Sequence, residues 1–315
     1  MGVWPERTSW ERPDGNLDET DDKVTGLLGR TIVTNGISGA FLPVTTQRVR
    51  LRILNGSTAR LYNFGFADDR EFSVVGTDGG LLALPVAVTR IALSPGERVE
   101  IVVDAGTEPV MLRSFPIDDR AGLGRDAAAF GVDDEFDILE LVPAGTLAPS
   151  PALPATLASV PAIDVSAPAA QRSFTLQWFM INHTRMDMSR VDLNVAVDSV
   201  EVWTVRNADN WPHNFHVHDV QFQVIDVNGT APPPWLGGWK DTVYLPPGTP
   251  IRLAMRFADY TDPTLPYMYH CHMLMHEDQG MMGQFLVLAP GQLPAPAPMA
   301  GMGGHGHSGD DSTTR

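Results

Sequence analysis

The fold is indicated most directly by a short stretch of the chain, Arg48-Val49-Arg50-Leu51-Arg52-Ile53-Leu54-Asn55-Gly56. Apolar and basic side chains alternate through it, and side chains two residues apart lie on the same face of a β-strand. One face of this strand is therefore apolar and the other basic, as in a half-buried strand. The Asn-Gly pair that follows it is a typical turn.

The same pattern of short strands between turns recurs along the chain. Strands are expected over 71–75 and 98–103, next to the turns Asp78-Gly79-Gly80 and Ser94-Pro95-Gly96-Glu97. Further strands are expected over 174–179, 199–205, 221–227, 251–257, 267–272 and 284–288. Many short strands without a long amphipathic helix favour an all-β protein built from sandwiches or barrels.

The length and the composition divide the chain into segments. Its 315 residues are enough for two domains that each bury a core. Pro, Ala and Ser dominate residues 143–171, which is typical of a semi-extended linker. We expect an extended lead-in over 1–24, a first domain over 25–142 and a second over 172–290. A flexible tail rich in Met, His and Gly is expected over 291–315.

Charge and cysteine content narrow the class of function. With 38 acidic and 22 basic residues the net charge is −16, which disfavours nucleic acids and anionic membranes as partners. No run of about 18 apolar residues offers a membrane span, and the N-terminus lacks the basic start and apolar run of a signal peptide. The only cysteine, Cys271, cannot form an intramolecular disulfide, so its thiol needs another role.

Metal binding is indicated by two short segments that hold six of the nine histidines and the cysteine. They are Trp211-Pro212-His213-Asn214-Phe215-His216-Val217-His218 and His270-Cys271-His272-Met273-Leu274-Met275-His276-Glu277-Asp278-Gln279-Gly280-Met281. One histidine alone is more often structural than a ligand. Six of them beside a single cysteine reverse that expectation.

Strand alternation divides these side chains between two sites. If residues 267–272 are extended, His270 and His272 lie on one face and Cys271 lies on the other. The same rule places His216 and His218 on a common face, where they can join His270 and His272 in one imidazole cluster. Cys271 therefore belongs to a different site, and its backbone links that site to the imidazole cluster.

The thiolate's own partners are then His213, His276 and Met281. Two imidazoles, a thiolate and a thioether are the ligand set of a blue-copper, electron-transfer centre. Zinc is the rival metal, but structural zinc prefers more thiolates and has no use for a thioether. The alternative for Met281 is a core-filling role beside the neighbouring methionines.

These segments resemble the C-terminal copper motifs of the multicopper oxidases, the laccase-like and cuprous-oxidase family. Weaker matches are Gly238-Trp239-Lys240-Asp241-Thr242-Val243, Leu54-Asn55-Gly56-Ser57-Thr58-Ala59-Arg60, Asp78-Gly79-Gly80 and Pro95-Gly96-Glu97-Arg98. The resemblance covers roughly residues 25–290 and is greatest to the bacterial three-domain members. It implies two cupredoxin-like Greek-key β-sandwich domains in tandem and a periplasmic or secreted protein.

The resemblance also implies residue roles. A type 1 copper, which takes single electrons from a small phenolic or metal-ion donor, is held by His213, Cys271, His276 and Met281. Four further histidines are implied to be half the ligands of a trinuclear copper centre that reduces dioxygen to water. His216 resembles its type 2 ligand, and its type 3 ligands are matched by His218, His270 and His272. Glu277 resembles the acid that relays protons to that centre, and Asp209 and Asp278 resemble acids beside the donor. The alternative for these carboxylates is a solvated loop.

The remaining trinuclear ligands of the family come from two His-x-His motifs in an N-terminal cupredoxin domain. Residues 1–171 contain no histidine, so the first domain resembles the copper-free middle domain of a three-domain oxidase. Another His-x-His, His305-Gly306-His307, lies in the tail, and we do not expect it to complete the cluster. With Met299 and Met302 it is a candidate for loose copper binding.

Two classes of function follow. In the first, the chain is part of a multicopper oxidase and needs a missing N-terminal cupredoxin domain in the same polypeptide or another subunit. In the second, it is a copper-binding electron-transfer or copper-handling protein without oxidase activity. We favour the first, because the four clustered histidines have no purpose in a simple blue-copper protein. A copper-free structural relative is disfavoured by the retained ligands.

Overall fold

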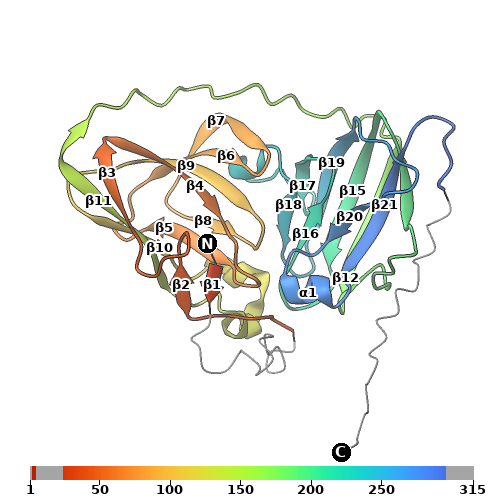
Figure 1. Cartoon of the computed structure of the whole chain (residues 1–315), viewed down its shortest axis with the longest axis horizontal. Coiled ribbons are helices and arrows are strands. Elements are labelled where there is room, and N and C mark those ends of the chain that lie inside the picture. Colours follow the sequence, from red (N-terminus) through yellow and green to blue (C-terminus); the bar gives the residue numbers. More distant parts are fainter. Residues whose placement is uncertain (1, 5–23, 296–315) are drawn as a thin grey trace, which may run out of the picture.

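The computed structural model of the chain describes residues 2–4 and 24–295. The main regular elements of these residues are β-strands, arranged as two sandwiches that lie side by side (Figure 1). The all-β fold class predicted from strand periodicity is confirmed, and so are the two sandwiches in tandem that the family resemblance implied. Within the described residues, no helix is long and apolar enough to cross a membrane.

The first sandwich packs a five-stranded sheet against a four-stranded sheet. The five-stranded sheet has the order β3 (Phe41–Thr46), β11 (Phe136–Ala148), β10 (Val110–Ser114), β5 (Tyr62–Phe66), β8 (Ile91–Leu93). The other has the order β4 (Arg48–Leu54), β9 (Arg98–Asp104), β6 (Phe72–Thr77), β7 (Gly80–Val88). In β4 the predicted apolar face, Val49, Leu51 and Ile53, packs into the core. All pairs are antiparallel except β3 with β11.

The second sandwich packs two five-stranded sheets around a larger aromatic core. One sheet has the order β13 (Met180–Ile181), β12 (Ala170–Gln177), β15 (Ser199–Asn207), β19 (Pro250–Phe257), β17 (Phe222–Val227). The other has the order β14 (Leu193–Ala196), β21 (Met282–Leu288), β20 (Tyr267–His270), β16 (His213–Val217), β18 (Thr242–Leu245). Trp203 is fully buried at the centre, within 6.3 Å of five other aromatic rings.

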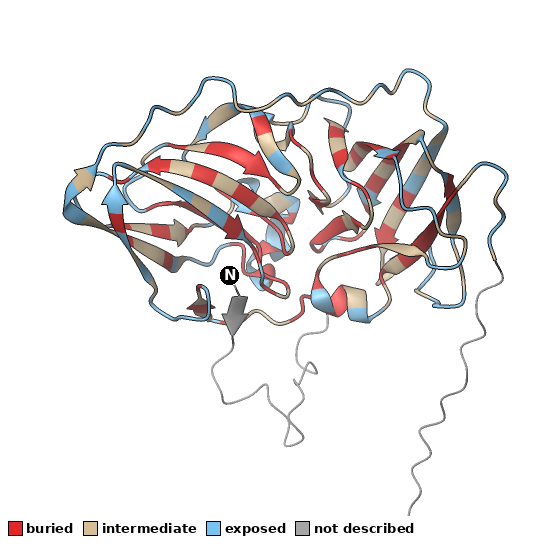
Figure 2. Cartoon of the chain, turned by 45° about the horizontal axis from the view of Figure 1, so that its top comes forward, coloured by how far each residue is buried: buried red, intermediate tan, exposed pale blue. Residues whose placement is uncertain are grey.

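Short helices and a small sheet complete the described chain. They are η1 (Asp118–Gly122), η2 (Gly124–Phe130), η3 (Pro234–Leu236), α1 (Leu274–Asp278) and the pair β1 (Gly2–Trp4) and β2 (Thr31–Val33). The strand β11 continues to Ala148, so it includes the first residues of the predicted linker. The rest of the linker, up to residue 169, has no strand and is mostly exposed or half-buried (Figure 2).

Polar groups hold the two sandwiches together at their boundary. The amide of Gly79 and the hydroxyl of Thr77 both donate to the carbonyl of Trp239, at 2.7 and 2.9 Å. The hydroxyl of Tyr244 donates to the carbonyl of Ala121 at 2.8 Å. Because buried backbone groups need partners, these bonds fix the position of β18 and its preceding loop against the first sandwich. The tail motif with Met299, Met302, His305 and His307 lies outside the described residues.

Candidate metal centre

Three predicted ligands, His213, Cys271 and His276, meet inside the second sandwich, and these three and Met281 are all fully buried. His213 begins β16, Cys271 directly follows β20, His276 lies in α1 and Met281 directly precedes β21. The Cys271 sulfur lies 3.8 Å from His213 Nδ1 and 3.5 Å from His276 Nδ1. Backbone hydrogen bonds from Met281 N to His276 O, at 2.9 Å, and from Cys271 N to Met281 O, at 3.1 Å, bring Met281 beside them. We name these four residues the first cluster.

The hydrogen-bond partners of the two Nε2 atoms in the first cluster determine which ring nitrogen carries the proton. Nε2 of His213 is 3.0 Å from Asp209 Oδ2, and Nε2 of His276 is 2.7 Å from the carbonyl oxygen of Val24. A carbonyl oxygen and an ionised carboxylate only accept hydrogen bonds, so each Nε2 carries the ring proton. Each Nδ1 therefore keeps its lone pair on the side of Cys271.

This arrangement suits a metal ion. The two Nδ1 atoms face each other at 3.0 Å, and two lone pairs at that distance repel unless a cation lies beside them. Burial raises the pKa of the Cys271 thiol to about 12 and lowers the pKa of His276 to about 3. The thiolate thus needs a positive charge to form, and the neutral imidazoles are ready to bind one. Two imidazoles and a sulfur, with a methionine whose backbone is hydrogen-bonded to two of these residues, offer a copper donor set.

A second group of imidazoles lies on the other side of the same strands, and we name it the second cluster. His216 on β16 is the cross-strand partner of His270 on β20, and the rings of His218 and His272 lie beside them. Ring centroids are 5.1 to 5.3 Å apart among neighbours. The ligand atoms of His216, His218 and His270 all lie within 4.8 Å of one another. Burial and the neighbouring imidazoles lower the pKa of His218 to about 4.

The strand β20 ends at His270, yet the alternation expected for residues 270–272 holds. The rings of His270 and His272 face His216, while the sulfur of Cys271 faces the first cluster. The two clusters therefore share one short piece of backbone.

The three predicted carboxylates have different surroundings. Glu277 Oε2 in α1 lies 3.2 Å from His270 Nδ1. Burial alone would raise the pKa of Glu277, but this hydrogen bond and the nearby imidazoles outweigh it and hold the pKa below its usual range. Asp209 is buried and accepts from both the Trp178 amide and His213. Asp278 is exposed at the last residue of α1.

Asn214, for which no role was predicted from the sequence, lies between the two clusters. Its side chain is fully buried, and Oδ1 accepts from the His272 amide at 2.6 Å and from the Cys271 thiol at 3.5 Å. The position of Asn214 inside the histidine segment is the only signal that pointed to it, because its partners lie 57 and 58 residues further along the chain.

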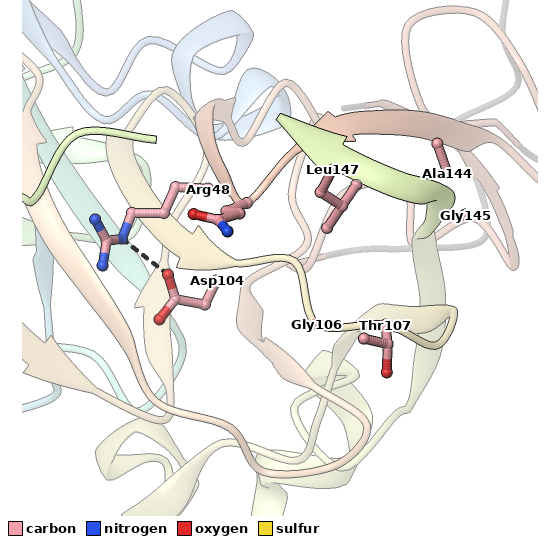
Figure 3. Close-up of a pocket in the computed structure, with 8 residues that line it drawn as sticks. Arg48, Asp104, Gly106, Thr107, Ala144, Gly145 and Leu147 are labelled. Carbon is pink, nitrogen blue, oxygen red and sulfur yellow. Dashed lines mark hydrogen bonds and ion pairs between the residues drawn. The ribbon is translucent and has the colours of Figure 1, made fainter. Parts of the chain in front are cut away.

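The described part of the chain also has cavities away from the two clusters. One cavity of about 530 Å³ is lined by residues of the first sandwich, including the end of β11. Its wall contains Arg48 and Asp104, which form an ion pair at 2.8 Å (Figure 3). Another of about 470 Å³ lies between the sandwiches and is mainly apolar, with Trp235 and Tyr244 in its wall. Neither is lined by a residue of the two clusters.

Comparisons with known proteins agree with this geometry. Two family models, both described as multicopper oxidase, match residues 26–118 and 157–291. A multicopper oxidase of Staphylococcus haemolyticus is 30% identical over 283 residues, which are 86% of this chain and 55% of the relative. The cell division protein FtsP of Escherichia coli is 33% identical over 269 residues, which are 83% of this chain and 56% of that protein. The chain thus spans about half the length of the curated relatives it matches.

Solved structures give the same result. A multicopper oxidase from Pediococcus acidilactici has a TM-score of 0.75 at 32% identity, and the match covers 92% of this chain and 58% of that one. A multicopper oxidase from Campylobacter jejuni, described as a metallo-oxidase, has a TM-score of 0.71 at 27% identity, covering 84% and 58%. Copper is the metal of this family, and the two clusters offer the donor atoms to hold it. With both sandwiches matched in sequence and in fold, this chain belongs to the multicopper oxidase family.

Proposed function

We propose that this chain is part of a copper-dependent oxidoreductase that oxidises small donors one electron at a time. His213, Cys271, His276 and Met281 hold a type 1 copper, and the donor is a phenolic compound or a metal ion. His216, His218, His270 and His272 supply half the ligands of a trinuclear copper centre that reduces dioxygen to water. The other half comes from a further cupredoxin domain, in the same polypeptide or in another subunit.

One observation carries this proposal, namely the position of Cys271 between two histidines that face the other way. Its sulfur lies within 3.8 Å of both Nδ1 atoms of the first cluster. His270 and His272, its covalent neighbours, have ring centroids 5.2 Å from that of His216 in the second cluster. A simple electron-transfer site does not require the second cluster, and an isolated imidazole cluster does not require the thiol. Shared backbone is the arrangement expected of a chain that moves electrons from one site to the other.

Copper, when bound, supplies reversible one-electron chemistry, and the residues around it control access and protons. The first cluster is fully buried, so water is excluded from it. Asp209 Oδ2 and the Val24 carbonyl keep the ring protons of His213 and His276 on the outer nitrogens. At the second cluster Glu277 Oε2 accepts from His270 Nδ1, and we assign this half-buried carboxylate the role of relaying protons to that cluster.

The second candidate is a copper-binding electron-transfer or copper-handling protein without oxidase activity. The relatives named as the cell division protein FtsP favour it, because that name describes no oxidase. A periplasmic or secreted location suits both candidates and follows from the family resemblance alone.

The test begins with the purified chain loaded with Cu²⁺. We expect an intense visible absorption and a tightly bound copper at the first cluster, both lost in Cys271→Ser. The control is His183→Ala, since His183 is an exposed histidine outside both clusters and its removal leaves the absorption unchanged. If Cys271→Ser keeps the intense band, the thiolate is not a ligand and the proposal is wrong.

Oxygen consumption separates the two candidates. The isolated chain is expected to consume no dioxygen with a phenol or Cu⁺ as donor. Oxygen uptake should appear when a cupredoxin domain with two His-x-His motifs is present. If the chain exchanges electrons at its first cluster but consumes no oxygen even when that cupredoxin domain is present, it is an electron-transfer or copper-handling protein.

A further inference from the structure

The first sandwich carries no histidine, yet one of its turns contacts the second cluster directly and is linked to Cys271 of the first cluster through Asn214. This turn, Ser94–Arg98, joins β8 to β9, and we name it the clamp turn. It is tight, because the Glu97 amide donates to the Ser94 carbonyl at 3.1 Å and Gly96 has a φ of +82°. β8 lies on the side of the first sandwich that faces β16 and β18 (Figure 1).

The backbone of the clamp turn packs directly on the ring of His272. A Cβ atom placed on Gly96 would lie 2.6 Å from Cδ2 and 3.0 Å from Nε2 of that ring. Such distances are shorter than van der Waals contact, and the positive φ independently favours glycine. Gly96 therefore sets how far the His272 ring can move toward the first sandwich.

Asn214 connects the clamp turn to the segment that follows β20 and contains Cys271 and His272. Its Nδ2 donates to Ser94 Oγ at 3.0 Å and to the Pro95 carbonyl at 2.7 Å. Its Oδ1 accepts from the His272 amide at 2.6 Å. Both donors and the acceptor of this buried amide are used, so its orientation is fixed by the two sandwiches together.

Arg98, the last residue of the clamp turn, acts on His216 through Asp241. Its guanidinium binds the Asp241 carboxylate with two hydrogen bonds of 2.6 Å. The Asp241 carbonyl lies 2.9 Å from His216 Nδ1, and Thr242 Oγ1 lies 3.0 Å from the same nitrogen. Because the Thr242 hydroxyl donates to Asp241 Oδ1 at 2.8 Å, its oxygen is left to accept.

Both groups around His216 Nδ1 are acceptors, so that nitrogen must carry the ring proton. Nε2 then keeps its lone pair toward the other imidazoles of the second cluster. Behind this contact Lys240 bridges Asp78 at 2.9 Å and Glu97 at 3.2 Å, and all three charged groups are buried. These ion pairs hold the clamp turn against the loop that contains Asp241.

We propose that the copper-free sandwich is a positioning element for the second cluster. Through Arg98 and Asp241 it fixes the Nδ1–H tautomer of His216, and through Gly96 and Asn214 it fixes the place of the His272 ring. The cluster is thereby organised to bind metal before any metal arrives. The metal-binding part of this inference rests on the proposed function, whereas the tautomer part does not.

The first measurement needs no metal. Nitrogen NMR of ¹⁵N-histidine-labelled, metal-free chain distinguishes the two ring tautomers, and we expect His216 to be Nδ1–H. In Arg98→Gln the Asp241 loop loses its anchor, so a mixture of tautomers is expected. The matched control is Arg48→Gln, which breaks the Arg48–Asp104 ion pair of the first sandwich (Figure 3) and leaves the His216 signals unchanged.

The second measurement is a Zn²⁺ titration of chain whose first cluster already holds copper. Loss of a partner that orients a ligand typically weakens metal binding about 10- to 100-fold, so Arg98→Gln should bind Zn²⁺ that much more weakly than Arg48→Gln. The visible absorption of the first cluster should not change. If Arg98→Gln does not fold, Arg98→Lys keeps the charge but loses the two-pronged geometry and serves in its place.

The outcomes separate the two proposals. If the unsubstituted chain binds no Zn²⁺ at the second cluster, the proposed function is contradicted, and the tautomer measurement still decides the positioning role. If Zn²⁺ binds and Arg98→Gln retains both the affinity and the pure Nδ1–H tautomer, the positioning role is overturned while the proposed function stands.

Discussion

Replacing Lys240 with methionine should destabilise the chain far more than replacing an exposed basic residue. The Lys240 side chain is 2% exposed, and its ammonium lies between the buried carboxylates of Asp78 and Glu97. Methionine fills similar space without a charge and leaves both carboxylates without their cation. Removing one partner of a buried ion pair costs about 3–5 kcal/mol, and we expect that loss in the free energy of unfolding.

Urea denaturation of the metal-free chain measures this loss. The control is Arg50→Met, since Arg50 is 47% exposed and pairs with Glu100 at the surface. Exposed ion pairs contribute about 0–1 kcal/mol, so the control should stay below 1 kcal/mol. Adding Asp78→Asn and Glu97→Gln to Lys240→Met should recover most of the stability, because no uncompensated charge remains buried.

The loss should also depend on pH. Burial raises the pKa of Glu97 even in the presence of Lys240, and removing the ammonium raises it further. A group whose pKa is higher in the folded state takes up its proton there first as pH falls, which stabilises the fold. The penalty of Lys240→Met should therefore shrink in acid. A loss no greater than that of Arg50→Met, or a triple variant no more stable than the single one, would refute this reasoning.

Three further outcomes are expected. Gly283→Ala should lower the free energy of unfolding by about 1–3 kcal/mol, because the added Cβ would lie 2.3 Å from the buried ring of Tyr269. The control is Gly145→Ala, which should leave the free energy of unfolding unchanged because there is open space around Gly145. Asp209→Asn weakens the acceptor at His213 Nε2 and should lower copper affinity about 10- to 100-fold in a chelator competition. Cu²⁺ should raise the melting temperature and a chelator should reverse the rise, because only the folded chain presents the first cluster, and Cys271→Ser should abolish the effect.

The parts of the fold and site that were predictable from the sequence depend on local periodicity. The alternation of β4 needs only neighbouring residues, and its bounds agree with the structure. The opposite directions of Cys271 and its two histidines follow from the same rule, although β20 ends at His270. Local rules suffice here because consecutive side chains of an extended backbone must diverge.

What the sequence did not reveal depends on pairings between distant residues. Asn214 meets Ser94 and Pro95, which precede it by 120 and 119 residues, and Lys240 meets Asp78 across an even larger separation. No local pattern distinguishes a buried lysine from a solvated one. The acceptor for His276 is the Val24 carbonyl, a backbone group that every residue type possesses. Such contacts are set by how the two sandwiches dock, so they appear only with the tertiary structure.

Some contacts from the first half of the chain reach histidines of both clusters. His276 of the first cluster depends on Val24 for the place of its proton, and His216 of the second depends on Arg98 through Asp241. In addition, the Thr58 carbonyl accepts from the Leu274 amide at the start of α1. A second sandwich separated from residues 24–148 would retain every ligand but lose control of two tautomers. The ligand motif alone is therefore an insufficient description of the candidate metal sites, because the tautomers of His276 and His216 depend on residues of the half of the described chain that has no ligand.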